Sequence, residues 1–269
     1  MTDLKMPIIG YMKSPYTEKF GIPRQPNLVK IESYIEMIAP YNDLLAFEGI
    51  EEFSHLWLIW QFHDNKNQQD SDKFRPQVRP PRLGGNKKMG VFATRSMYRP
   101  SPMGLSVVKL NKVEKVGKSV RVYVTGSDLL NDTPILDIKP YIQYSDAVLD
   151  AKSGYAQDEP IRKQVIWQDD AQIQQQNLLK KNKITSQLID ELEQVLSLDP
   201  RPAYQDDVER IYTKLKNKAH FVPVHVMLYT LPGVPSIYYG SEFGIEGRKE
   251  KKTTDVIRRK NTLHPILRR

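Results

Sequence analysis

The chain has 269 residues, a length that fits one large domain or two modest ones. It contains no cysteine, which excludes a disulfide framework and any metal site built on thiolates. Its net charge is +8, from 40 Lys and Arg against 32 Asp and Glu, but residues 206–269 alone hold 13 basic and 7 acidic residues. Much of the basic excess therefore lies near the end, and RNA binding by the rest depends on local clusters.

The N-terminal sequence MTDLKMPIIGYMKSPY lacks the long apolar run of a signal peptide. No other stretch is apolar over the length needed to span a bilayer. We therefore expect a cytoplasmic protein with no membrane partner.

The first 145 residues predict β structure. The apolar run LWLIWQFH at residues 56–63 is typical of a buried strand, and SVRVYVTG alternates strictly, with the valines at 120, 122 and 124 on one face. Gly117 just before that run predicts a hairpin turn. Short strands separated by Pro and Gly favour a barrel or sandwich over repeated βαβ units, and no Gly-x-Gly-x-x-Gly follows a strand, so a Rossmann dinucleotide site has no support.

Two stiff polar stretches interrupt this region. The first, GIPRQPNLV, holds Arg24 between prolines and fits a rigid connection or a binding loop equally well. The second, VRPPRLGGNKKMGVFATRSMYRPSP at residues 78–102, carries four arginines among prolines and glycines. Arginine suits planar recognition of carboxylate, phosphate and RNA, and Pro100 and Pro102 hold Arg99 in an extended segment. We interpret this stretch as an anion or nucleotide site, with a solvated surface loop as the alternative.

The segment TGSDLLNDTPILDIKPY, residues 125–141, places three aspartates at strand ends or turns. Asp132-Thr133-Pro134 is typical of a turn, so we expect a structural role for Asp132. Asp137 lies in an apolar run with Lys139 two residues on, and thus on the same strand face. This spacing fits either a structural ion pair with a buried carboxylate or a positioned base.

Two histidines lie eight residues apart, His55 and His63, and the sequence near them supplies no third ligand. This pattern is weak for a metal, and no metal site is predicted. We expect a hydrogen-bonded core histidine at 55, while the role of His63 stays open.

From Asp169 the pattern changes to helices. AQIQQQNLLKKNK predicts one helix and TSQLIDELEQVLSLD a second. The second has one apolar face, formed by Leu188, Leu192, Val195 and Leu196. Ser186 is expected to cap its start, and Pro200 with Pro202 to prevent its continuation. Residues 148–168, rich in Asp, Lys and Gln, form the predicted junction.

Five motifs occur in an order typical of one family: SPYTEKFGIPRQPNLV, EEFSHLWLIWQFH, VRPPRLGGNKKMGVFATRSMYRPSPMGLS, DLLNDTPILDIKPY and LDPRPAYQ. Over residues 7–205 the chain resembles the TrmO (YaeB/TsaA) family of tRNA methyltransferases. One departure is Ser101, where the family's Arg-Pro-Asn-Pro motif has Asn, and both residues are small and polar. The resemblance implies S-adenosylmethionine-dependent methylation of N6 in the threonylcarbamoyl-modified adenosine at position 37 of tRNA.

The resemblance also implies a mainly β fold, with a β-barrel S-adenosylmethionine-binding domain unlike the Rossmann type, a small α+β C-terminal unit and a homodimer. Cofactor contacts carried over to matching positions are Pro26, Asn27, Leu28, His63, Asp64, Arg95, Leu105, Thr125, Gly126, Ser127 and Asp128. Within that set we expect Arg95 to hold the cofactor's carboxylate and Asp128 to accept from its hydroxyl or amino groups.

Methyl transfer to this nitrogen calls for a base or polarising group, because a carbamoylated nitrogen is a poor nucleophile while it keeps its proton. Asp137 is the candidate base. Lys139 or Arg99 is expected to steer the threonyl carboxylate or the phosphates of tRNA, and Arg99 is the candidate RNA contact.

The sequence departs from this family after Gln205. Residues 206–254 resemble a fragment of the α-amylase (glycoside hydrolase family 13) superfamily, including PGVPSIYYGSEFG, with Asp207 at the position of that family's transition-state-stabilising aspartate. Glycosidase activity is not expected, because the barrel that supplies the other carboxylates is absent.

We therefore divide the chain into a β-barrel methyltransferase domain (1–147), a small helical unit (148–205) and an atypical tail (206–269). The alternative to a methyltransferase is an RNA- or cofactor-binding module without turnover, because its C-terminal domain is replaced.

Overall fold

Residues 5–65, 74–200 and 236–237 are described by the structure, a computed structural model. Two compact units divide the chain: residues 1–162 with 194–206 form the first, and residues 163–193 with 207–269 form the second. The predicted tail 206–269, including Asp207, lies outside the described residues except for Ser236–Ile237.

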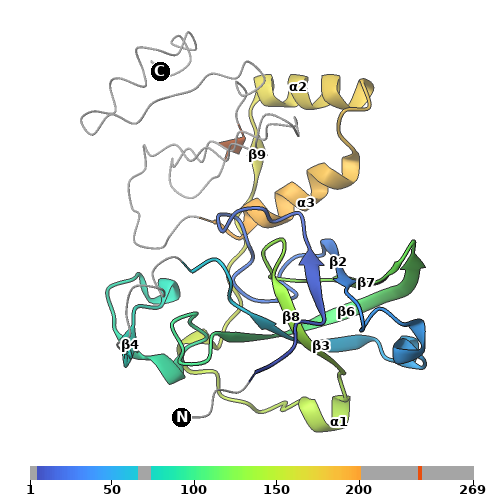
Figure 1. The fold of residues 1–269 in the computed structure, drawn as a ribbon. Helices are drawn as coiled ribbons and strands as arrows, with labels where there is room; N and C mark the ends of the chain where they lie inside the picture. The colour runs from blue at the N-terminus through green and yellow to red at the C-terminus, as the bar shows by residue number, and fades with distance from the viewer. Residues whose placement is uncertain (1–4, 66–73, 201–235, 238–269) are drawn as a thin grey trace. The chain divides into compact units, whose positions relative to one another are not determined.

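Six strands build the first unit (Figure 1). They are β1 (Gly10–Lys13), β2 (Glu32–Met37), β3 (His55–Gln61), β6 (Met103–Val116), β7 (Ser119–Thr125) and β8 (Pro134–Pro140). Their order is β1-β2-β7-β6-β3-β8, and every pairing is antiparallel. β1 has a partner on each side, β2 and β8, so the pairing continues from the last strand to the first. The predicted mainly β fold is confirmed.

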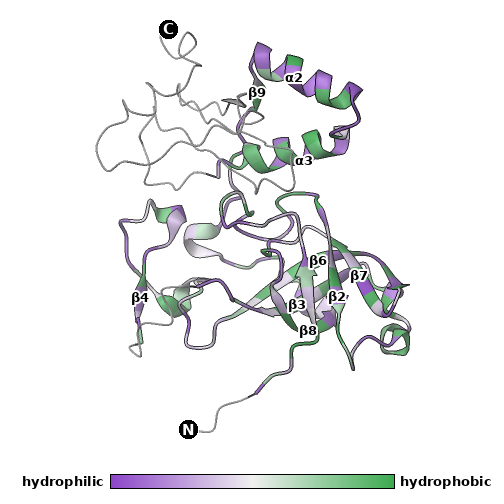
Figure 2. Ribbon diagram, turned by 45° about the horizontal axis from the view of Figure 1, so that its top comes forward, coloured by the Kyte–Doolittle hydropathy of each residue, from purple (hydrophilic) through white to green (hydrophobic). Residues whose placement is uncertain are grey.

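Alternating side chains from these strands form the core (Figure 2). The valines at 120, 122 and 124 are fully buried, as predicted, and so are Leu56 and Leu58 of β3. Burial of each such side chain stabilises the fold by about 1.5–3 kcal/mol. The predicted hairpin turn is also confirmed, because Gly117 links β6 to β7 with φ of 62°.

A β-bulge changes the direction of side chains along β8. Ile59 pairs with Asp137 while its neighbour Trp60 pairs with Ile135, which leaves Leu136 as the extra residue. Asp137 therefore turns outward with its side chain 41% exposed, and its carboxylate lies 3.1 Å from the ammonium of Lys139. The ion pair of the structural alternative is present, but its carboxylate is only partly buried.

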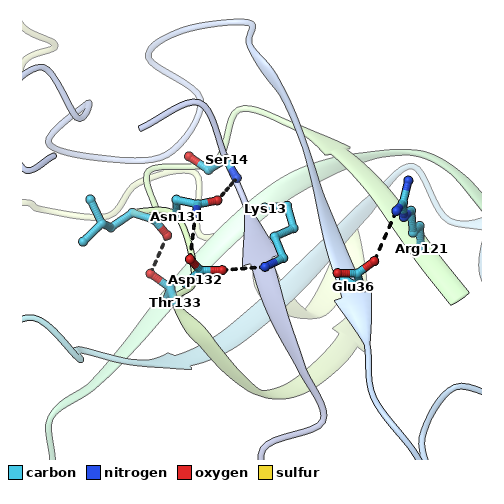
Figure 3. Close-up of polar contacts among 8 residues, drawn as sticks. Lys13, Ser14, Glu36, Arg121, Asn131, Asp132 and Thr133 are labelled. Carbon is cyan, nitrogen blue, oxygen red and sulfur yellow. Dashed lines mark hydrogen bonds and ion pairs between the residues drawn. The ribbon is translucent and has the colours of Figure 1, made fainter. Parts of the chain in front are cut away.

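The turn before β8 is tied to β1 by polar contacts (Figure 3). Asp132 has a left-handed backbone, with φ of 61°, and its carboxylate lies 2.6 Å from Lys13 Nζ. The side-chain oxygen of Asn131 accepts a hydrogen bond from the backbone N–H of Ser14 at 3.1 Å. The turn role predicted for Asp132 is confirmed. The turn fixes the end of the segment that connects β7 to β8.

Short elements decorate this unit. A small hairpin pairs β4 (Gln77–Val78) with β5 (Met89–Gly90). One-turn helices are η1 (Leu44–Phe47), η2 (Ile50–Glu52), η3 (Pro81–Leu83), η4 (Val91–Ala93), α1 (Gln143–Asp146) and η5 (Gly154–Ala156). Gly84, in the left-handed region at φ of 72°, ends η3, so the glycine pair of the Arg-rich stretch serves a tight turn.

The predicted helices are present. They are α2 (Asp169–Lys180) and α3 (Ser186–Ser197), and β9 (Ile166–Trp167) pairs with β10 (Ser236–Ile237). The predicted cap is wrong, because Thr185 and not Ser186 accepts from the backbone N–H of Leu188, at 3.1 Å. Within the second unit, the Trp167 indole donates to Glu193 at 2.6 Å. None of the described helices is long and apolar enough to cross a membrane.

The close contact between Gly104 and Trp60 gives a first prediction. A Cβ on Gly104 would lie 2.2 Å from the indole carbons of Trp60, a side chain only 8% exposed. Gly104→Ala should therefore lower the free energy of unfolding by about 1–3 kcal/mol through overpacking, measured by urea denaturation. Gly90→Ala is the matched control, since nothing lies within 4 Å of its added Cβ. Equal unfolding energies for the two variants would contradict this packing.

Candidate functional site

A cavity of about 580 Å³ opens beside the sheet in the first unit. Its wall combines the ends of β3 and β6 with the loops at 19–25, 62–65, 94–99 and 128–133. The predicted site residues that line it are His63, Asp64, Arg95, Arg99, Leu105 and Asp128. Its volume is in the range of sites that enclose a small organic ligand.

A chain of hydrogen bonds leads from the core to Asp128. The indole N–H of Trp60 donates to the hydroxyl of Ser106 at 3.0 Å, and that hydroxyl donates to the carboxylate of Asp128 at 2.7 Å. Trp60 and Ser106 are buried on the neighbouring strands β3 and β6. Two rigid strands therefore fix the orientation of the Asp128 carboxylate.

Burial raises the pKa of Asp128 to about 6, because desolvation disfavours the charged form. The hydrogen bond from Ser106, a backbone N–H and the positive charge of Arg95 act in the opposite direction and limit the rise in pKa. The carboxylate is thus held near the point where it gains or loses a proton around neutral pH. A group in this state is a candidate for proton transfer.

Arg95 supplies positive charge to the same cavity. It follows η4, is exposed, and donates to the side-chain oxygen of Gln25 at 2.6 Å. Gln25 belongs to the first stiff stretch of the sequence, so the structure brings the two stretches together at the cavity. A guanidinium on an accessible wall can bind a carboxylate through two N–H donors.

Arg99 lines the cavity but also supports the loop that carries Arg95. Its guanidinium donates to the carbonyls of Thr94 at 2.5 Å and Val91 at 3.5 Å, and lies 5.7 Å from the ring centroid of Phe92. Arg99, which precedes Pro100, therefore both lines the cavity and stabilises the loop at residues 91–95.

Other predicted contacts lie behind the cavity wall. Asn27 has φ of 64°, its N–H donates to the carbonyl of Gly126 at 2.8 Å, and its side-chain amide donates to the carbonyl of Val107 at 2.9 Å. Gly126 has φ of 89°, and a Cβ there would lie 2.4 Å from the Asn27 side-chain oxygen. The structure thus joins two predicted stretches that are far apart in the sequence, through a contact two residues before Asp128.

The remaining residues of these two stretches take supporting positions. The Thr125 hydroxyl is hydrogen-bonded to the side chain of Asn111, and the Ser127 hydroxyl accepts from the N–H of Leu129 at 3.2 Å. Pro26, Asn27, Leu28, Thr125, Gly126 and Ser127 are outside the cavity lining. Only Asp128 of the predicted 125–128 segment faces the cavity.

His63 and Asp64 lie where the chain leaves β3. His63 is exposed at the rim, and Asp64 lies 3.5 Å from the ammonium of Lys19. His55, at the other end of β3, is hydrogen-bonded to the Ser54 hydroxyl at 2.9 Å. Within the described ranges, no group of three or more His, Asp or Glu is placed to hold a metal ion.

The cavity does not include the predicted base. Asp137 and Lys139 are both absent from its lining and are paired with each other at the surface. The sequence reasoning instead missed Trp60 and Ser106. A signal for Ser106 was present, because it occupies an inward position of β6 in register with the buried Val108 and Leu110. A serine at such a position needs a buried hydrogen-bond partner.

Two parts of the chain match profiles of a known protein family. Residues 11–147 match the tRNA-methyltransferase O N-terminal domain, and residues 160–215 match the TrmO C-terminal domain. The second match continues past Gln205, where the sequence pattern predicted the family resemblance to stop.

Known proteins agree with these matches. The tRNA (adenine(37)-N6)-methyltransferase of Escherichia coli K12 is 44% identical over 210 residues, which cover 78% of this chain and 87% of that protein. A Pseudomonas aeruginosa protein provisionally named S-adenosylmethionine-dependent methyltransferase RcsF is 44% identical over 198 residues, covering 73% and 81%. The crystal structure of TrmO from Pseudomonas aeruginosa has a TM-score of 0.65 at 31% identity, covering 88% of this chain and 97% of that one.

The carboxylate of Asp128 should make stability depend on pH. Its pKa is about 6 in the folded chain against an ordinary value of 3.8, so the folded state binds the proton more tightly. The contribution of Asp128 to stability is therefore full below its ordinary pKa of 3.8 and is lost as the pH rises through about 6. Relative to Asp128→Asn, the wild type should lose about 1 kcal/mol of unfolding free energy between pH 5 and pH 7, measured by urea denaturation. Parallel pH profiles for the two proteins would show that Asp128 is not desolvated.

Proposed function

Because the chain belongs to the tRNA-methyltransferase O (TrmO) family, we propose that it methylates N6 of adenosine 37 in tRNA with S-adenosylmethionine as methyl donor. The observation that carries this proposal is the cavity in which Arg95 and a buried, hydrogen-bonded Asp128 occur together. Positioning of two reactants in such a cavity supplies much of the acceleration of a displacement reaction.

The residues present fit S-adenosylmethionine. Arg95 matches the carboxylate of its methionine part, and the tryptophans Trp57 and Trp60 with Phe62 supply apolar surface for its adenine. Asp128 can accept from an amino or hydroxyl group. His63 and Leu105 complete the rim, while Asn27 and Gly126 act behind the wall by fixing the segment that ends in Asp128.

When bound, S-adenosylmethionine supplies the methyl group from its sulfonium. The chain has to orient N6 of the adenosine, exclude water and take the proton that N6 loses. We assign that proton to the carboxylate of Asp128, which lies in the cavity and is oriented by Ser106. Asp137 stays the alternative base, with Lys139 as its partner.

The substrate we propose is the threonylcarbamoyl-modified form of adenosine 37. Its threonyl carboxylate needs a cation near the methylated nitrogen, and Arg99 lines the cavity near Arg95 with a guanidinium anchored by the Thr94 carbonyl. We further propose that the chain works in the cytoplasm, as a homodimer. For residues 206–254 we keep the proposal of an α-amylase-like sequence without glycosidase activity, although residues 206–215 also match the TrmO C-terminal domain.

Arg95 provides the test of cofactor binding. Arg95→Ala removes the partner of the cofactor carboxylate, so the Kd for S-adenosylmethionine measured by calorimetry should rise about 10-fold or more. Arg79→Ala is the matched control, because Arg79 is exposed and is not among the lining residues. Equal affinities in both variants would remove Arg95 from the cofactor site.

Methylation of tRNA tests the function itself. The full chain should transfer a methyl group to tRNA carrying threonylcarbamoyl-adenosine 37 and much less to tRNA lacking the threonylcarbamoyl group. In single-turnover experiments Asp128→Asn should slow transfer roughly 100-fold or more, while Asp137→Asn should leave it near the wild-type rate. The reverse order would make Asp137 the base. Cofactor binding without any methylation by the wild type would support the module without turnover.

A further inference from the structure

The segment from Phe74 to Arg99 concentrates positive charge. It contains seven Lys and Arg and no Asp or Glu, a net charge of +7, whereas the whole chain has +8. The basic residues are Arg75, Arg79, Arg82, Lys87, Lys88, Arg95 and Arg99. All are exposed except Arg99, which is partly buried, and none of the seven forms an ion pair with a carboxylate in the described ranges. Within the described ranges, the segment therefore presents charge that no carboxylate pairs.

Four of these cations have contacts within the chain: Arg95 donates to Gln25, Arg75 lies over the Tyr98 ring, and two more donate to backbone carbonyls. Arg82 donates to the backbone carbonyl of Asp158, and Arg99 donates to loop carbonyls. Arg79, Lys87 and Lys88 extend from the β4–β5 hairpin and are exposed. Such a row of exposed cations on a short, Pro- and Gly-rich scaffold fits a phosphate backbone.

Exposed aromatic rings accompany the charge. Phe74 and Phe92 stack with their centroids 6.1 Å apart and their planes at 29°, and they are 57% and 68% exposed. Arg99 lies over Phe92, and Arg75 lies 5.1 Å from the ring centroid of Tyr98. Exposed rings next to arginine planes are the platforms on which unpaired nucleic-acid bases stack.

The same segment forms part of the cavity wall. Thr94, Arg95, Met97 and Arg99 all line the cavity. RNA bound along the hairpin would therefore lie next to the place where the methylated base has to enter. An acidic peptide would satisfy the charges but would leave the paired rings without a planar partner, so single-stranded RNA fits both features better.

We propose that residues 74–99 form the docking element for the single-stranded loop of the tRNA substrate. Arg79, Lys87 and Lys88 contact phosphates, and the Phe74–Phe92 pair stacks against an unpaired base of that loop. This inference rests on the proposed function, because it identifies the surface that delivers adenosine 37 to the cavity.

The experiment measures tRNA affinity of the full chain against salt concentration. Removing two phosphate contacts in Lys87→Gln/Lys88→Gln should weaken binding and reduce the slope of log Kd against log salt by about 1.4. Phe74→Ala/Phe92→Ala should weaken binding roughly 5- to 150-fold with the slope unchanged. Calorimetric affinity for S-adenosylmethionine should stay at the wild-type value in both variants, which shows that they fold.

A matched control removes the same charge elsewhere. Lys115→Gln/Lys118→Gln changes two exposed lysines around the β6–β7 turn, on the side of the sheet away from β4 (Figure 1). This variant should bind tRNA like the wild type. Equal loss in the two lysine variants, or no loss in either, would overturn the docking element. If the wild type itself bound no tRNA, the proposed function would fail instead.

Discussion

The site depends on one buried interaction, the hydrogen bond from Ser106 to Asp128. A carboxylate in a partly desolvated position is costly, and it persists because a hydroxyl, a backbone N–H and the nearby Arg95 offset part of that cost. Ser106 can do this only because the Trp60 indole donates to the same hydroxyl and fixes its orientation. The indole in turn needs the space above Gly104. Packing in the core and acidity in the cavity are therefore linked.

The loops around the cavity follow the same logic of mutual support. Asn27 adopts a left-handed backbone and bonds to Gly126, the residue two before Asp128. On the other side of Asp128, the turn at Asn131–Asp132 is held to β1 by Ser14 and Lys13. The carboxylate is thus fixed by the chain before it, the chain after it and the strand beside it. Such preorganisation is what a proton acceptor needs, because no reorientation then precedes transfer.

The local pattern of the sequence was enough for β3, β7 and both helices, but it did not predict β1 or β2. Strict alternation in β7 and the apolar periodicity of α3 depend on nearest neighbours, and those predictions hold. The bulge in β8 was not predictable, because it is decided by the register against β3 and not by the residues of β8 alone. That register turns the side chain of Asp137 outward. Its apolar neighbours in the sequence had suggested a buried position. Long-range contacts also decide that Asp128 faces the cavity while its neighbours at 125–127 do not. The sequence of this segment alone could not show which of its side chains would face the cavity.

The proposed site and the proposed docking element both use positive charge, and the two uses affect Asp128 differently. The positive charge of Arg95 lowers the pKa of Asp128 and so makes its carboxylate a weaker proton acceptor. On the proposed docking, the phosphates of RNA on residues 74–99 would act in the opposite direction, because they would cancel part of that positive field. Docking would therefore raise the affinity of Asp128 for a proton as the adenosine arrives. Most cations of this basic segment lie on the β4–β5 hairpin, and only its end borders the cavity. On the proposed docking, the segment could therefore attract RNA without lowering the pKa of Asp128 further.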